Sequence, residues 1–123
     1  MLKIEQYHHD GLGLNDLITI HADERDPNAG GASHTYTVTM GGGKEVAHVQ
    51  YQHGPRDVDG STPGITDAAL LTIVRDRMLA FQAGPFADPH NEIALRCVEI
   101  AILAERTRAE SRAKRGVLGK NVK

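Results

Sequence analysis

Hydrophobic and polar residues alternate in the first half of the chain, whereas apolar residues recur at helical spacing in the second half. Glycine-rich segments separate the alternating stretches, and Gly41–Gly43 has the composition of a β-hairpin turn. The alternation predicts strands at residues 1–9, 17–22, 34–40 and 44–53. These strands are expected to form one small antiparallel sheet.

Two helices are predicted in the second half. The first covers residues 66–83, with Thr66 as its N-cap. The second covers residues 88–116, with Asp88 as its N-cap and Pro89 at the first helical position. Because only a short linker separates them, the helices are expected to form an antiparallel hairpin.

The expected fold class is therefore α+β. A length of 123 residues favours a single domain with a core of modest size. Within it we expect the sheet at residues 1–53, the helical hairpin at residues 66–116 and a tail at residues 117–123.

The last helix carries two apolar stripes. The second consists of Leu95, Val98 and Ile102, and the first, expected to be buried, consists of Ile93, Cys97, Ile100, Ala104 and Thr107. A surface helix of a small domain needs only one such stripe, so two stripes imply packing against the rest of the chain and against another subunit. The buried stripe expected on the preceding helix is Leu70, Ile73, Val74, Met78 and Phe81.

Positive charge is concentrated at the end of the last helix. Residues 106–123 hold seven Lys or Arg and one acid, whereas the whole chain has a net charge of −2. A helix C-terminus favours cations, so a solvated basic end is one interpretation. The other is a clamp for phosphate, since guanidinium groups bind phosphate oxygens in pairs. The basic residues cluster at one end of the chain instead of spreading over a face, and the aromatic content is only 4%. Both features argue against a polymeric nucleic-acid partner.

The sequence offers little catalytic or metal-binding chemistry. His8 and His9 are adjacent on a predicted strand, so they would point to opposite faces, and no His-x-x-x-His spacing occurs. The single cysteine, Cys97, is expected in the core of a cytosolic protein. Neither glycine-rich loop opens a helix as a phosphate loop does. We therefore expect a binding protein without metal or cofactor, and the apolar runs are too short for a membrane span.

Asn91 lies in the first turn of the last helix, where free backbone amides can bind an anion or a carbonyl group. Phe81 is expected near the same corner of the hairpin, either as a core residue or as a stacking surface. Asn91 and Arg108 are seventeen residues apart, about 25 Å along a helix. One compact ligand reaches both only if two such helices run antiparallel across a dimer.

Several segments resemble a known family. FQAGPF at residues 81–86, Asn91 and LAERTRAESRAKRGVLG at residues 103–119 resemble the helical hairpin shared by two groups of phage signal sponges. One group sequesters the cyclic oligonucleotides of CBASS immunity, and the other is the Thoeris anti-defence family. GLGLNDLITI at residues 11–20 and HVQYQHGPR at residues 48–56 are similar to the Thoeris type.

The resemblance implies a non-enzymatic protein that binds cyclic ADP-ribose isomers made by TIR-domain enzymes in the cytoplasm of the infected host. It also implies a hexamer built from dimers, and in some members separate sites for cyclic trinucleotides. By motif position, Phe81 would stack on adenine, Asn91 would form a hydrogen bond, and Arg108 and Arg112 would bind the pyrophosphate. Further candidates are Arg56 for the same ligand and Arg115 for a trinucleotide.

Two other functions remain open from the residues. One is an enzyme that hydrolyses the same signal with histidines and a metal. The other is a small phage assembly protein whose basic helix end contacts nucleic acid.

Overall fold

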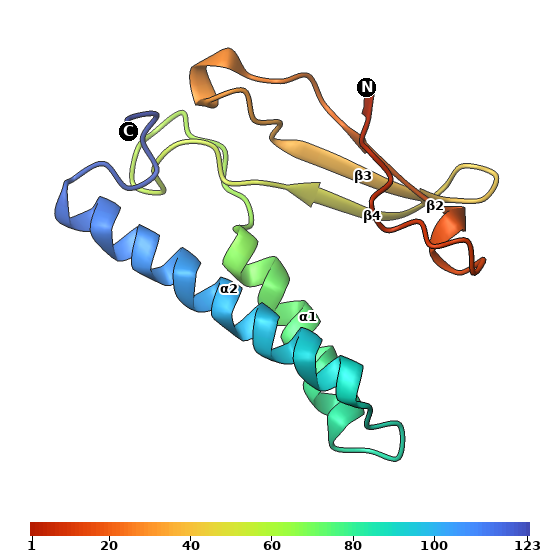
Figure 1. The fold of residues 1–123 in the computed structure, drawn as a ribbon. Helices are drawn as coiled ribbons and strands as arrows, with labels where there is room; N and C mark the ends of the chain where they lie inside the picture. Colours follow the sequence, from red (N-terminus) through yellow and green to blue (C-terminus); the bar gives the residue numbers. More distant parts are fainter. The chain divides into compact units, whose positions relative to one another are not determined.

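The computed structural model describes all 123 residues, Met1–Lys123, and has the predicted α+β fold (Figure 1). A four-stranded antiparallel sheet precedes two helices. The chain divides into two compact units, one of residues Met1–Gly64 with Gly119–Lys123 and one of residues Ile65–Leu118. The first unit contains the sheet and the second contains both helices.

The strands pair in chain order, β1-β2-β3-β4. Their bounds are Leu2–Lys3 for β1, Ile18–Ala22 for β2, Thr35–Met40 for β3 and Lys44–Gln50 for β4. Short 3₁₀ helices at Asn15–Leu17 and Pro27–Ala29 lie in the connections that flank β2. The Gly41–Gly43 segment turns β3 into β4, as predicted, and Gly43 has a positive φ of 97° that favours glycine.

The first predicted strand, residues 1–9, is wrong beyond Lys3. Ile4 still donates its N–H to the Ile20 carbonyl, but the chain then turns, and the His8 and His9 rings both reach the Ile18 carbonyl oxygen at 2.8 and 2.9 Å. Two imidazoles bound to one backbone carbonyl hold this segment beside β2 without a ladder.

The glycine-rich loop after this turn is closed by an acid. Asp16 accepts hydrogen bonds from the N–H groups of Asp10, Gly11 and Gly13 at 3.0 to 3.1 Å. These bonds, led by the one from Gly11, lower the pKa of Asp16. The amides that a phosphate would need are therefore already used, which agrees with a turn rather than a phosphate loop.

The sheet has a thin core. Ala22 is its fully buried apolar residue, and Ser33 is the buried polar one. Alternation along β3 predicts that Tyr36, Val38 and Met40 face inward. Met40 is nevertheless exposed, whereas Tyr36 packs edge-on against Tyr51 with ring centroids 5.8 Å apart. Met40 is exposed because it ends β3 at the hairpin turn.

The helical unit contains α1, Asp67–Gln82, and α2, Pro89–Lys114. The Thr66 side chain accepts the Ala69 N–H at 3.2 Å, and the Asp88 side chain accepts the N–H groups of His90 and Asn91. Both predicted N-caps are confirmed. Neither helix combines the length and the apolar character needed to cross a bilayer.

Packing between the helices uses the second stripe of α2. Leu95 is 1% exposed and is the largest fully buried side chain, while Val98 and Ile102 are partly covered. The first stripe was expected to be buried but is exposed in the single chain, with Ile100 at 65% and Cys97 also exposed. On α1, likewise, Ile73, Val74 and Phe81 of the predicted buried stripe are exposed, and Leu70 and Met78 are partly covered. One chain therefore leaves a long apolar surface on α2 uncovered.

Leu95→Ala should destabilise the helical unit by about 2–5 kcal/mol, because it removes buried methyl groups and leaves a cavity. Urea unfolding followed by circular dichroism at 222 nm measures the change. Leu103→Ala, at a side chain 58% exposed on the same helix, is the matched control and should change stability little. Equal effects of the two substitutions would contradict this assignment of the core.

Low pH should loosen the start of α2. The His90 and Asn91 N–H groups lower the pKa of Asp88 below its usual 3.8. The contribution of Asp88 to helix stability is therefore complete above that value and is lost as the pH falls through the lower folded-state pKa. Asp88→Ala should remove this part of the pH dependence, as thermal melts between about pH 2 and 6 would show. A variant with the wild-type pH profile would argue against it.

Candidate ligand-binding site

An open hollow lies where α1 turns into α2. Phe81, Phe86 and Asn91 line its volume of about 500 Å³. Phe81 is 43% exposed and Phe86 is 75% exposed, so both rings present apolar surface to solvent. Solvent-exposed rings beside a single amide are typical of a surface that stacks on a flat ligand and orients it by a hydrogen bond.

Asn91 is held firmly in this hollow. Its Nδ2 donates to the Gln82 Oε1 at 3.0 Å and to the Met78 carbonyl at 3.4 Å. Gln82 Oε1 also accepts the Asp88 N–H at 2.9 Å, which closes the turn between the helices. Both hydrogen bonds that orient the Asn91 side chain are donated by its Nδ2. Its Oδ1 therefore remains available to accept a hydrogen bond from a ligand.

The Arg77 guanidinium lies over one face of the Phe81 ring. The Arg77 guanidinium carbon lies 5.2 Å from the Phe81 ring centroid, within the range of a cation–π contact. Sequence periodicity favours Phe81 as a core residue, but its ring is 43% exposed. Its role in stacking on a ligand stays a prediction.

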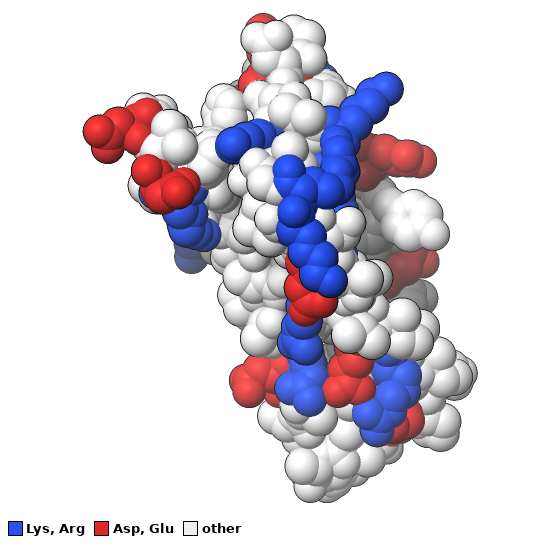
Figure 2. All heavy atoms as spheres, turned by 90° about the vertical axis from the view of Figure 1, so that its left-hand side faces the viewer, with Lys and Arg blue, Asp and Glu red and all other residues white.

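The predicted arginines lie at the other end of α2. Arg108 is exposed and makes no hydrogen bond or ion pair within the chain. Arg112 donates from Nη2 to the Val117 carbonyl at 3.0 Å, and Arg115 is the C-cap residue. Figure 2 shows the face that lies toward the left in Figure 1, where Lys and Arg side chains form a column with Asp or Glu side chains within and beside it.

Arg56 belongs to the sheet-containing unit. Its Nη2 donates to the Gly64 carbonyl at 2.7 Å, which ties the loop that follows β4. The structure thus brings Phe81 and Asn91 together, as predicted. Arg108 and Arg112 lie one helical turn apart near the other end of α2. The structure does not join these two pairs within one chain, because seventeen residues of helix separate Asn91 from Arg108.

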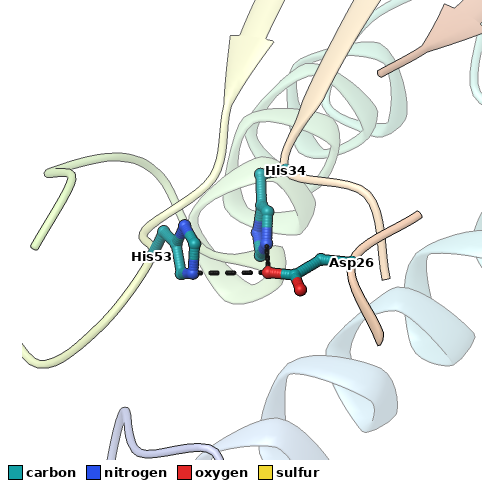
Figure 3. Close-up of side chains that lie close together, drawn as sticks. All are labelled: Asp26, His34 and His53. Carbon is teal, nitrogen blue, oxygen red and sulfur yellow. Dashed lines mark hydrogen bonds and ion pairs between the residues drawn. The ribbon is translucent and has the colours of Figure 1, made fainter. Parts of the chain in front are cut away.

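A second cluster of polar side chains was missed by the sequence analysis. Asp26, His34 and His53 offer one ligand atom each, all within 4.8 Å of one another (Figure 3). His34 Nε2 lies 2.9 Å and His53 Nε2 3.6 Å from the same oxygen, Asp26 Oδ2. The hydrogen bond from His34, followed by the one from the Asn28 N–H, lowers the pKa of Asp26.

No protein-family model matches the chain, and a search of curated proteins finds no match either.

Proposed function

We propose that the protein binds and sequesters a cyclic ADP-ribose immune signal of the glycocyclic type without degrading it, as a phage anti-defence sponge. The observation that carries the proposal is the uncovered apolar stripe on α2. Paired between two copies, it would bring the hollow of one chain to the level of the arginines of the other. The resemblance of the hairpin to the Thoeris sponges supplies the class of ligand.

The stripe has the spacing of a helix–helix seam. Its five residues, Ile93 to Thr107, follow one another at intervals of four, three, four and three. This heptad pattern keeps one face of a helix against a neighbouring helix over several turns. Its small members, Cys97 and Ala104, allow close approach. A second copy of α2 is therefore a suitable partner for this surface.

Antiparallel pairing centred on Ile100 would align the two ends. Asn91 lies nine residues before Ile100, and Arg108 lies eight residues after it. Along a helix axis this places Arg108 of one chain level with Asn91 of the other to within about 1.5 Å. Arg112, twelve residues after Ile100, would be level with the N-cap Asp88 of the other chain. The two groups would then lie at the same level along the helix pair, with Asn91 on the α1 side of its helix.

The chemistry of these groups suits a dinucleotide-like anion. Phe81 and Phe86 can stack on adenine, Asn91 can accept a hydrogen bond, and two guanidiniums can bind the pyrophosphate in a bidentate manner. Two aromatic rings and an amide bind a ligand but do not transfer protons, which favours sequestration over hydrolysis. Nanomolar binding requires about −12 kcal/mol, within reach of such contacts between rigid helices.

Higher assembly is also part of the proposal. By resemblance, three such dimers would form a hexamer in the host cytoplasm, and Arg115 would serve a separate cyclic trinucleotide site. Arg56, which lies in the other unit, is the remaining candidate for either ligand.

The test separates binding from hydrolysis. Purified protein is incubated with a glycocyclic ADP-ribose, passed through a desalting column and denatured by heat, and the supernatant is chromatographed. Recovery of the intact signal supports sequestration. A new product would show hydrolysis instead, and absence of any retained nucleotide would refute the proposed ligand.

A further inference from the structure

We propose that Asp26, His34 and His53 form a binding site for a divalent transition-metal ion of the Zn²⁺ type. The site lies wholly within the sheet-containing unit and does not depend on the proposed function. Two imidazoles and one carboxylate are the protein donor set of many three-ligand sites, in which the fourth position is left to water or another ligand.

Backbone pairing fixes each of the three donors. His34 precedes β3, and its carbonyl accepts the Tyr51 N–H at 2.8 Å. His53 exchanges two backbone hydrogen bonds with Thr62 at 2.8 and 2.9 Å. Asp26 pairs with Ala32 through a similar bridge. Three separate segments are thus held so that their side chains meet at one point, as Figure 3 shows.

The donor distances are close to those of a metal site. Tetrahedral ligands at bond lengths of about 2.0–2.1 Å from a Zn²⁺ ion lie roughly 3.3 Å apart. The two imidazole nitrogens lie 2.9 and 3.6 Å from the shared Asp26 oxygen. The rings of His34 and His53 are stacked, with centroids 3.8 Å apart and planes at 11°, so one ring must turn to point its lone pair at the ion. Turning a side chain is a small adjustment on a fixed backbone.

The surroundings orient the ligands as an outer coordination shell does. Asp26 Oδ1 accepts the Asn28 N–H at 2.9 Å, which leaves Oδ2 directed at the imidazoles. The Asp23 carboxylate accepts the backbone N–H of His34 at 2.9 Å, which fixes the main chain from which this imidazole projects. A hydrogen bond to the second carboxylate oxygen, as at Asp26, is what metal-binding carboxylates usually have.

Access is provided on one side. The side chains of His34 and Asp26 are 17% and 22% exposed, whereas that of His53 is 41% exposed. His53 also lines a hollow of about 430 Å³ with Gly54, Ser61 and Lys120. An ion can enter from this hollow, and a water or an anion there can complete its coordination.

Simple ion pairing explains the cluster less well. The Asp26 Oδ2 already has a hydrogen-bond partner in His34, at 2.9 Å. The second imidazole, from His53, is stacked on the first and has no acceptor of its own other than the same oxygen, at 3.6 Å. A cation bound to the cluster would take one lone pair from each of the three side chains.

The test uses full-length protein free of any histidine tag, stripped with a chelator and dialysed. Titration calorimetry with Zn²⁺ should show one ion per chain with a dissociation constant of micromolar or below. Asp26→Asn, His34→Gln and His53→Gln should each weaken binding at least tenfold, about the loss seen for mere outer-shell partners. His48→Gln, at an exposed histidine of β4, is the control and should bind as the wild type does.

Two further measurements separate ligation from folding. Circular dichroism of each metal-free variant shows whether the sheet-containing unit is intact, and Co²⁺ added to the wild type should give a visible absorption band that the folded variants lack. Zn²⁺ should also raise the melting temperature of the wild type but not of the variants. A wild type that takes up neither ion, or a His48→Gln control that loses as much affinity as the three variants, would overturn the proposal.

Discussion

Arg108→Ala is expected to weaken binding of the cyclic ADP-ribose signal by at least about thirtyfold, because loss of a charge-assisted contact to a buried phosphate costs about 2–5 kcal/mol. Arg108 has no partner within the chain, so its removal should leave the helix intact. Titration calorimetry gives the affinity, and size-exclusion chromatography with light scattering shows whether the oligomer is unchanged.

Arg106→Ala is the matched control. Arg106 has the same charge as Arg108 and lies in the same part of α2. On a helical projection, however, it lies on the side away from the first stripe, Ile93 to Thr107. Its loss should change affinity by less than about threefold, as expected of a distant, screened charge. If both substitutions weaken binding equally, general positive charge and not a placed guanidinium is responsible. Arg112 is a less clean test, because its Nη2 also binds the Val117 carbonyl.

Ile100→Glu is expected to prevent the proposed pairing of two α2 helices and to abolish signal binding together. In an antiparallel pair centred on this residue, the two new carboxylates would meet each other in an apolar seam, and unpaired buried charges cost several kcal/mol. Light scattering reports the mass, and calorimetry reports the affinity. Circular dichroism should remain that of the wild type, because Ile100 is exposed in the single chain.

Ile73→Glu provides the comparison on the other helix. Ile73 on α1 is 63% exposed, nearly the same as the 65% of Ile100, but it lies outside the stripe of α2. It should leave the proposed dimer and its affinity for the signal unchanged. A variant of Ile100 that stays oligomeric and binds normally would remove the basis for a site shared between chains.

Local signals in the sequence predicted the helices well. Thr66 and Asp88 were identified as N-caps from residue type and position alone, and both accept the backbone hydrogen bonds expected of them. The β3–β4 hairpin could be predicted equally well, since alternation and a glycine turn are short-range features of the sequence. The prediction of a strand over residues 1–9 was wrong beyond Lys3, because His8 and His9 bind the Ile18 carbonyl through their side chains. The loop that follows is held by Asp16 rather than by strand pairing.

Periodicity identified both stripes of α2 but could not tell which one the chain covers. Burial depends on where α1 lies, and the buried Leu95 shows that α1 covers the second stripe. Proximity of Phe81 to Asn91 followed from the hairpin alone. The meeting of Asp26, His34 and His53 could not be predicted, because three irregularly spaced residues converge only through the backbone bridges of their loops.

Native mass spectrometry of the protein mixed with a glycocyclic ADP-ribose tests sequestration between chains most directly. It weighs the assembly, counts the bound nucleotides and, after ejection, weighs the nucleotide itself. We expect an assembly with an even number of chains that carries nucleotide of unchanged mass. A monomer that binds none, or an ejected nucleotide heavier by one water, would contradict it.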